Sequence, residues 1–309
     1  MKKHLFATPF FFRVIVIVGL LCYGSFTFSM YATPTDSTWQ TKGFDFHISG
    51  GIYMAGKHAA MYYSGAAENE NNLNYIFGNK YYYDQINEFM LENNPEIGDS
   101  VFLGTLPSQM TYKPALSISL GFRYKFNRHW GLSMTYYFAK LTASNTFLLK
   151  RNGELGNKKP MEYEEYLVGK ESRSFIDLTA SYLFHPHPII KPFIEMGVQF
   201  NYARVNKFIA LFRDEDSGKE KEFDLLNIYP GQSYIPNTAM TEEKIVYGGA
   251  GYGFSFAAGL KLAINNTVSI DPTFYFSAGS IGLNGYKSID FHYGAYVRIV
   301  MSDLVFKSR

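Results

Sequence analysis

Ionisable side chains in this sequence occur one at a time within segments that alternate between apolar and small polar residues. Residues two apart share a face of a β-strand, so such side chains line one face of a sheet. Carboxylates, cations and imidazoles gathered on one face can form ion pairs, conduct ions or carry out acid–base catalysis. The candidate residues of this polar face are Asp45, His47, Arg123, Lys125, Asp177, Glu195, Lys261, Asp271, Asp290, His292 and Arg298.

The near balance of charge on this face favours ion pairing. It carries five carboxylates and four Lys or Arg side chains, and desolvating an isolated ion is too costly for them to remain unpaired in a narrow interior. We therefore expect a polar network that fills and rigidifies the interior. The alternative is a narrow, gated path for ions or small solutes.

A lipid-modifying enzyme is the third hypothesis. Ser288, Asp290 and His292 follow one another on the same face, which offers a Ser/His/acid set. No nucleophile motif such as G-x-S-x-G accompanies them. The sequence therefore favours a protein that is not an enzyme, and no catalytic residue is assigned.

Eight segments show the period-two alternation of β-strands. In the second segment, Leu116, Ile118 and Leu120 point one way, and Ser117 and Ser119 point the other. Strands are expected over residues 43–55, 114–126, 130–142, 174–184, 192–204, 250–263, 267–278 and 288–301. This even number of alternating segments predicts an all-β fold, an eight-stranded antiparallel up-and-down barrel.

The composition of the two faces indicates which one points outward. The apolar face carries Leu, Ile, Val, Phe and Tyr without charge, whereas the polar face consists largely of Ser, Thr, Gly and Ala. A soluble barrel has its apolar face inside and many Lys and Glu outside. A charge-free face suits lipid, where a charge costs about 2–4 kcal/mol at the midplane. The pattern predicts a transmembrane barrel with a polar lumen.

The connections between the segments alternate in length. Three of them, over residues 57–112, 143–172 and 205–247, are long, whereas the connections at the opposite end are short. Short periplasmic turns and long extracellular loops are typical of outer-membrane barrels. Within the first loop, the stretch from Tyr82 to Leu91 is expected to form a short amphipathic helix.

Residues 1–32 have the features of a secretory signal peptide. Lys2, Lys3 and Arg13 are positive, the run from 14 to 21 is apolar, and cleavage is expected between residues 29 and 32. An uncleaved anchor is the alternative, although the run is shorter than the roughly 18 residues of a spanning helix. The mature domain is then residues 33–309, in the bacterial outer membrane.

Composition excludes several other classes of protein. Charged residues make up 18% of the 309 residues, against roughly 25% in an average soluble domain. The net charge of +2 gives no strong field for nucleic acid, and a single Cys excludes an internal disulfide. His185 and His187 lack a third ligand, and the acidic run 214–216 lacks calcium-loop spacing, so no metal or cofactor is predicted.

Residues 43–301 resemble the eight-stranded outer-membrane β-barrel proteins of the OmpA/OmpX type, and in particular the barrel family common in Bacteroidota. The residues that carry the resemblance are the hairpin LSISLGFRYKFNRHWGLSMTYYF from Leu116, the strand KPFIEMGVQFNY from Lys191 and the hairpin YGFSFAAGLKLAINNTVSIDPTFYF from Tyr252. The resemblance implies an outer-membrane location, contact with outer-membrane lipid and assembly by the barrel-insertion machinery. The chain departs from the family in lacking a terminal aromatic residue, for which Phe306 is the nearest candidate.

The long loops give the first functional hypothesis. They are rich in Tyr and Asn, which are adaptable contact residues in recognition loops. We expect a structural or surface-interaction role, with an extracellular protein or glycan bound through loops 57–112, 143–172 and 205–247. The alternative is that these loops only cover the mouth of the barrel.

Overall fold

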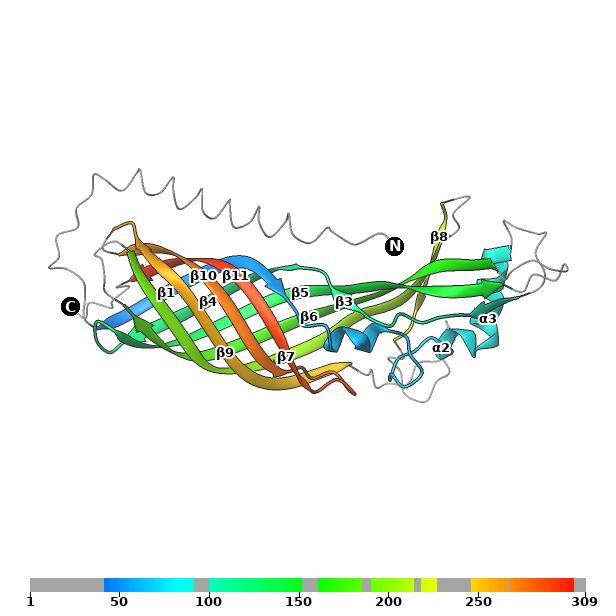
Figure 1. The fold of residues 1–309 in the computed structure, drawn as a ribbon, viewed down its shortest axis with the longest axis horizontal. Coiled ribbons are helices and arrows are strands. Elements are labelled where there is room, and N and C mark those ends of the chain that lie inside the picture. The colour runs from blue at the N-terminus through cyan, green and yellow to red at the C-terminus, as the bar shows by residue number, and fades with distance from the viewer. Residues whose placement is uncertain are drawn as a thin grey trace, which may run out of the picture. The chain divides into compact units, whose positions relative to one another are not determined.

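A ring of eight antiparallel strands forms the barrel (Figure 1). The computed structural model describes residues 42–91, 100–151, 161–184, 190–213, 218–226, 246–265 and 267–302; the expected signal peptide, residues 1–32, lies outside them. The ring strands are β1 (Gly43–Met54), β4 (Ala115–Lys125), β5 (Trp130–Arg151), β6 (Met161–Leu183), β7 (Ile190–Arg213), β9 (Gly248–Ala263), β10 (Val268–Ser280) and β11 (Ile289–Ser302).

Pairing between β1 and β11 closes the ring. Asp45 pairs with Ser302 at one end of the two strands and Met54 pairs with Tyr293 at the other. Every other ring strand pairs with the strand that precedes it and the strand that follows it in the ring. A closed ring leaves no unpaired edge within the bilayer. The fold class predicted from the alternation is confirmed.

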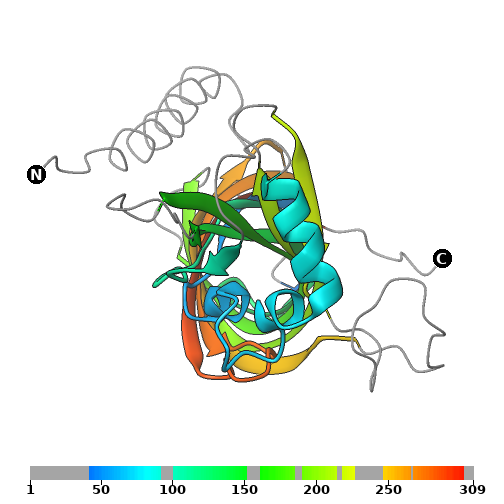
Figure 2. The same ribbon diagram turned by 90° about the vertical axis from the view of Figure 1, so that its right-hand side faces the viewer.

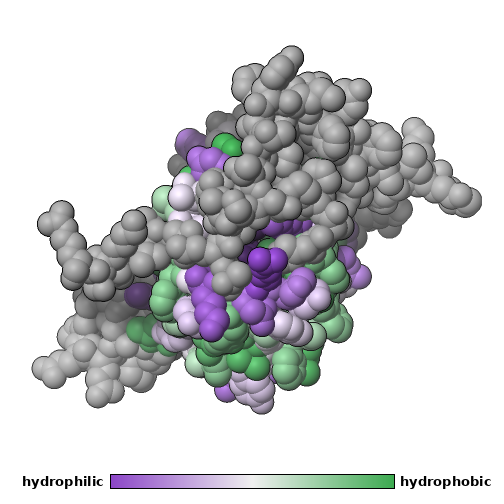
Figure 3. Space-filling model, turned by 90° about the vertical axis from the view of Figure 1, so that its left-hand side faces the viewer, coloured by the Kyte–Doolittle hydropathy of each residue, from purple (hydrophilic) through white to green (hydrophobic). Residues whose placement is uncertain are grey.

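Short turns at one end of the barrel are built by Asn side chains. Asn127 Oδ1 accepts hydrogen bonds from the backbone N–H groups of His129 (2.8 Å) and Trp130 (2.9 Å). Asn265 Oδ1 accepts in the same way from Thr267 (2.9 Å) and Val268 (2.7 Å). Both are turns in which an Asn side chain replaces a backbone acceptor. Figure 3 looks onto this end, where hydrophilic side chains gather near the centre and hydrophobic ones lie around them.

Large apolar side chains point outward around the ring. On β5 these side chains run from Trp130 to Tyr136 and are 36–52% exposed. On β7 they run from Ile194 to Tyr202 and are 38–64% exposed. A tilted strand needs about 9–11 residues to cross a bilayer, so these runs span most of the hydrocarbon region. We call this outward apolar band the lipid belt.

Three strands continue well beyond the lipid belt. β5, β6 and β7 have 22, 23 and 24 residues, and they pair up to Arg151 with Met161. The second expected loop, 143–172, is therefore strand at 143–151 and 161–172, and the third, 205–247, is strand at 205–213 and 220–224. Three further strands extend this sheet: β2 (Val101–Leu103) and β3 (Thr111–Tyr112) pair with β5, and β8 (Glu220–Asp224) pairs with β7.

The apolar residues move from the outward face of the strands to the inward face where the strands leave the lipid belt. On β5 the outward residues are polar from Lys140 to Thr146, while the inward residues Leu141, Ala143, Phe147 and Leu149 are buried. The apolar residues therefore line the inside of the extension and face lipid in the barrel. The strand predictions ended near residue 142 because the apolar alternation loses its phase there.

The first long loop folds against the inner face of this extension. It contains a 3₁₀ helix, η2 (Ala59–Tyr63), and two α-helices, α2 (Asn74–Phe77) and α3 (Lys80–Leu91). Figure 2 shows α3 lying across the end of the strands. The amphipathic helix expected near Tyr82–Leu91 is present, with Ile86 fully buried. Among the described residues, no helix has the length and apolar character needed to cross a bilayer.

The outward lipid belt gives a first testable prediction. Leu120 is 53% exposed on the belt, so Leu120→Arg is expected to lower the free energy of unfolding by about 2–4 kcal/mol in lipid vesicles. Thr146→Arg places the same side chain outward on the extension of β5 and is expected to change the free energy much less. Equal losses in the two variants, measured by denaturant unfolding, would contradict the assignment of the belt.

Candidate functional site: the lumen and its extracellular cap

Asp45 binds two cations near the short-turn end of the lumen. Its Oδ1 lies 2.9 Å from Lys125 Nζ and its Oδ2 lies 3.9 Å from Lys261 Nζ. The Asp45 side chain is fully buried, and that of Lys261 is 4% exposed. These three residues come from strands β1, β4 and β9, so the ion pairs join three strands of the barrel.

Glu195 is the centre of the next layer. Its Oε1 lies 2.5 Å from Arg123 Nη2 and its Oε2 lies 2.7 Å from Arg298 Nη1. The Phe193 ring contacts both guanidinium groups, at 5.6 Å from Arg123 Cζ and 5.8 Å from Arg298 Cζ. Both oxygens of one buried carboxylate are thus occupied, and the two cations share an aromatic face.

His47 on β1 extends over β4 to reach β5, beside this layer. Its Nε2 lies 3.1 Å from Thr135 Oγ1 on β5. A Cβ atom on Gly121 would lie 2.6 Å from the same nitrogen, so the missing side chain at position 121 makes room for the imidazole. The large His47 side chain on β1 is therefore accommodated by a glycine on the neighbouring strand β4.

Asp177 and Asp271 each accept a hydrogen bond from a neutral donor. Asp177 Oδ1 accepts a hydrogen bond from Gln199 Nε2 (3.0 Å), and Asp271 Oδ1 accepts one from Ser269 Oγ (2.8 Å). Gln199 also bonds Tyr275. These two carboxylates are therefore held by amide and hydroxyl groups of the lumen wall.

Three tyrosine rings fill the middle of the lumen. The centroids of Tyr137 and Tyr275 are 5.4 Å apart, those of Tyr137 and Tyr296 are 5.4 Å apart, and those of Tyr275 and Tyr296 are 5.8 Å apart. All three rings are at most 3% exposed. Arg298 Nη2 donates to Tyr137 Oη at 3.3 Å, which joins this aromatic layer to the Glu195 layer below it.

Asp290 and His292 hold the start of the first loop. Asp290 Oδ2 accepts hydrogen bonds from the backbone N–H groups of His58 (3.0 Å) and Ala59 (3.4 Å), at the beginning of η2. His292 Nδ1 accepts one from the Gly56 N–H (3.0 Å). The two residues of the hypothetical Ser/His/acid set are thus bonded to backbone, and Ser288 is exposed.

A further buried ion pair lies above the tyrosine layer, and it was not predicted from the sequence. Glu171 Oε1 lies 2.5 Å from Arg173 Nε, and both side chains are fully buried. Glu171 Oε2 accepts hydrogen bonds from Tyr63 Oη (2.7 Å) and Tyr112 Oη (2.9 Å). Burial raises the pKa of the Tyr63 hydroxyl well above its ordinary value, so the hydroxyl stays protonated and donates.

Both members of this pair were overlooked because the expected loop extended to residue 172 and the next strand was expected to begin at residue 174. The two-residue spacing of Glu171 and Arg173 was the available signal, and it continues the row that contains Asp177. Gly169 extends the same row, where a Cβ atom would lie 2.2 Å from the Tyr63 ring. The row therefore forms a seat for Tyr63 of the first loop.

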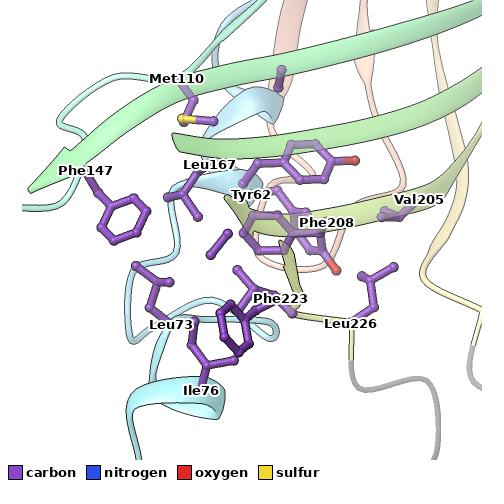
Figure 4. Close-up of a cluster of buried hydrophobic side chains, with 14 of the residues drawn as sticks. Tyr62, Leu73, Ile76, Met110, Phe147, Leu167, Val205, Phe208, Phe223 and Leu226 are labelled. Atoms are coloured by element: carbon purple, nitrogen blue, oxygen red, sulfur yellow. The ribbon is translucent and has the colours of Figure 1, made fainter. Parts of the chain in front are cut away.

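A buried apolar cluster lies between the first loop and the strand extensions (Figure 4). We call it the cap cluster. From the first loop it includes Tyr62, Tyr63, Leu73, Ile76 and Ile86, and from the strands it includes Phe147, Leu149, Leu167, Phe208, Phe212 and Phe223. All eleven are at most 3% exposed. Burying side chains of this size stabilises each by about 1.5–3 kcal/mol, so the cluster fixes the loop to the sheet.

Two asparagines of the first loop, Asn69 and Asn71, form hydrogen bonds that stabilise the loop. Asn69 Nδ2 donates to the carbonyls of Met61 (3.1 Å) and Tyr62 (3.2 Å), and its Oδ1 accepts from Tyr286 Oη (2.6 Å). Asn71 Nδ2 donates to Tyr62 Oη at 2.9 Å and is fully buried. Asn69 therefore satisfies backbone carbonyls of the loop, and Asn71 fixes the Tyr62 side chain.

The described residues contain no group of three His, Cys, Asp or Glu side chains that can hold a metal ion. His185, His187 and the acidic residues 214–216 lie outside the described ranges.

Comparison with known proteins gives structural neighbours only. No family model matches the chain, and no curated protein matches it in sequence. It is similar to the crystal structure of Neisserial surface protein A, with 10% identity, a TM-score of 0.42 and coverage of 85% of this chain and 98% of that one. It is also similar to outer membrane protein OprG of Pseudomonas aeruginosa, with 12% identity, a TM-score of 0.34 and coverage of 86% of this chain and 97% of that one. A third similar structure is that of Ail, the attachment invasion locus protein of Yersinia pestis, with 13% identity, a TM-score of 0.31 and coverage of 84% of this chain and 98% of that one.

The strand pairing and the distribution of side chains over the two faces define the class of the protein. A closed eight-stranded ring, an outward lipid belt and a polar lumen are the features of an outer-membrane β-barrel. The topology is the eight-stranded antiparallel barrel that the sequence alternation predicts.

The Glu195 layer gives a second prediction. Glu195→Gln leaves Arg123 and Arg298 buried without their shared carboxylate, so the free energy of unfolding in lipid vesicles is expected to fall by about 3–5 kcal/mol. The triple variant Arg123→Met, Glu195→Met, Arg298→Met removes all three charges and is expected to recover most of this loss. A Glu195→Gln variant as stable as the parent would show that the layer is not an ion-pair network.

Proposed function

We propose that this protein has a non-enzymatic surface-interaction role, performed by the folded first loop at the extracellular end. The observation that carries the proposal is the cap cluster, because it holds η2, α2 and α3 in place against the strand extensions. A loop that is ordered before it meets a partner loses little conformational entropy on binding. The cap is therefore suited to recognition.

The folded first loop, which we call the cap, also carries exposed aromatic side chains on its outer side. Tyr81 on α3 is 46% exposed and Phe102 on β2 is 44% exposed. Large aromatic side chains provide contact area at a low cost in entropy. An extracellular protein or glycan is the class of partner that such a surface fits.

A plugged lumen is the second part of the proposal. The lumen layers formed by Asp45, Glu195 and the three tyrosines contain buried side chains from opposite walls of the barrel. An eight-stranded barrel has an interior only wide enough for its own side chains. The polar network thus acts as a rigid filling that supports the cap.

A narrow water or ion path is the second candidate function. Ser277 and His292 are cross-strand neighbours in the lumen, and Ser277 Oγ and His292 Nε2 are buried without a hydrogen-bond partner among the described residues. Buried polar groups of this kind are commonly paired with water. Lipid modification ranks third, because Asp290 and His292 are bonded to the first loop.

The third prediction tests the exposed aromatic residues of the cap. Cells that display the parent are expected to adhere to particular components of an array of immobilised glycans and extracellular matrix proteins. Tyr81→Ser with Phe102→Ser is expected to reduce that adhesion about tenfold or more, because hot-spot aromatic residues contribute at least 2 kcal/mol each.

Both substitutions are exposed, so the barrel is expected to keep its heat-modifiable migration on a gel. Phe254→Ser on the lipid belt, far from the cap, is the matched control and is expected to leave adhesion unchanged. Adhesion by the double variant equal to that of the parent, or no adhesion by the parent, would contradict the proposed role.

A further inference from the structure

Four exposed cations lie on the outer wall just above the lipid belt. They are Lys140 on β5, Lys170 on β6, Arg204 on β7 and Lys113, which precedes β4. We call them the basic patch. The patch is on the outside of the wall, so it is separate from the lumen and from the cap cluster.

The strand register places these cations in two adjoining rows. Lys140 pairs with Ser172, which pairs with Arg204, so the two cations flank one small residue. In the next row, Thr142 pairs with Lys170, and the Lys113 N–H donates to the Thr142 carbonyl at 2.9 Å. Neighbouring strands are about 4.8 Å apart, so Lys140 and Arg204 start roughly 10 Å apart.

The belt itself fixes the height of the patch. Arg204 follows the exposed Tyr202 on the outward face of β7, and Lys140 lies four residues beyond the exposed Tyr136 on β5. Outer-membrane barrels carry aromatic residues at the membrane–water interface. Each step of two residues rises about 7 Å along the strand, which brings the cations to the level of the lipid headgroups.

Charge pairing distinguishes the patch from the remaining outer wall. Farther from the belt, Lys150 lies 3.8 Å from Glu162, and Arg213 lies 2.5 Å from Glu220. Among the described residues, none of the four patch cations has a carboxylate within 4.0 Å; the ion pairs found there involve other residues. Like charges close together on a sheet destabilise it, and an anionic ligand removes that cost.

We propose that the basic patch binds the phosphate groups of outer-leaflet lipids. Arg204 offers a planar fork of donors that matches a phosphate, and the three lysines act as point charges around it. This inference deepens the expected contact with membrane lipid by locating it on one side of the barrel. It does not depend on the proposed role of the cap.

Lipid retention tests the patch. The parent is reconstituted in vesicles of phosphatidylcholine and phosphatidic acid, extracted in mild detergent and weighed by native mass spectrometry. It is expected to retain phosphatidic acid in preference to phosphatidylcholine, and to lose the preference at high salt. Lys140→Gln with Lys170→Gln and Arg204→Gln is expected to retain about tenfold less phosphatidic acid, because each cation near an anionic surface contributes to binding.

The matched control removes two lysines and one arginine elsewhere on the extracellular part. Lys80→Gln, Lys150→Gln and Arg213→Gln are expected to retain phosphatidic acid as the parent does. Heat-modifiable migration shows that each variant is folded. The proposal is overturned if the control loses as much lipid as the patch variant, or if the parent shows no preference for phosphatidic acid.

Discussion

The interior of an eight-stranded barrel is only wide enough for side chains, so every ionisable group placed there must be ion-paired or hydrogen-bonded by the other side chains of the lumen. This protein meets the constraint in layers. Asp45 joins β1 to β4 and β9, and Glu195 joins β7 to β4 and β11. Each of these two carboxylates holds two cations from other strands. Three of the four pairs join strands that are not neighbours in the ring, and the fourth, Asp45 with Lys125, joins the neighbouring strands β1 and β4. The layer of Tyr137, Tyr275 and Tyr296 lies above them, and Glu171 accepts a hydrogen bond from Tyr63 of the first loop.

The surface of the membrane divides the structure into two kinds of wall. Within the lipid belt the strands are apolar outside and polar inside, whereas beyond it the same strands are polar outside and apolar inside. Water replaces lipid as the outer solvent at that level, and the hydrophobic effect then favours an apolar core between strands and loop. The cap cluster is that core. The cap and the basic patch are therefore two consequences of one inversion, on the inner and outer sides of the same strands.

The alternation of apolar residues was sufficient to predict the ring and the row of lumen residues. Arg123, Glu195 and Arg298 were placed on one face by spacing alone, although their mutual pairing requires the barrel to close. The extensions of β5 to β7 were not predictable in this way, because the apolar residues change phase near residue 140. Glu171 was consequently assigned to a loop. The buried Asn69 and Asn71 show the same limit, since composition distinguishes a Tyr- and Asn-rich loop but not whether its side chains face inward or outward.

A plugged lumen is the part of the proposal that distinguishes a surface role from a narrow pore. Single-channel recording of the purified full chain in a planar lipid bilayer tests it most directly. The account predicts no conductance steps for the parent, and steps for a variant in which Tyr137, Tyr275 and Tyr296 are all replaced by Ala, because that variant loses the aromatic layer. Steady conductance steps from the parent, equal to those of the variant, would contradict the account and would favour the pore.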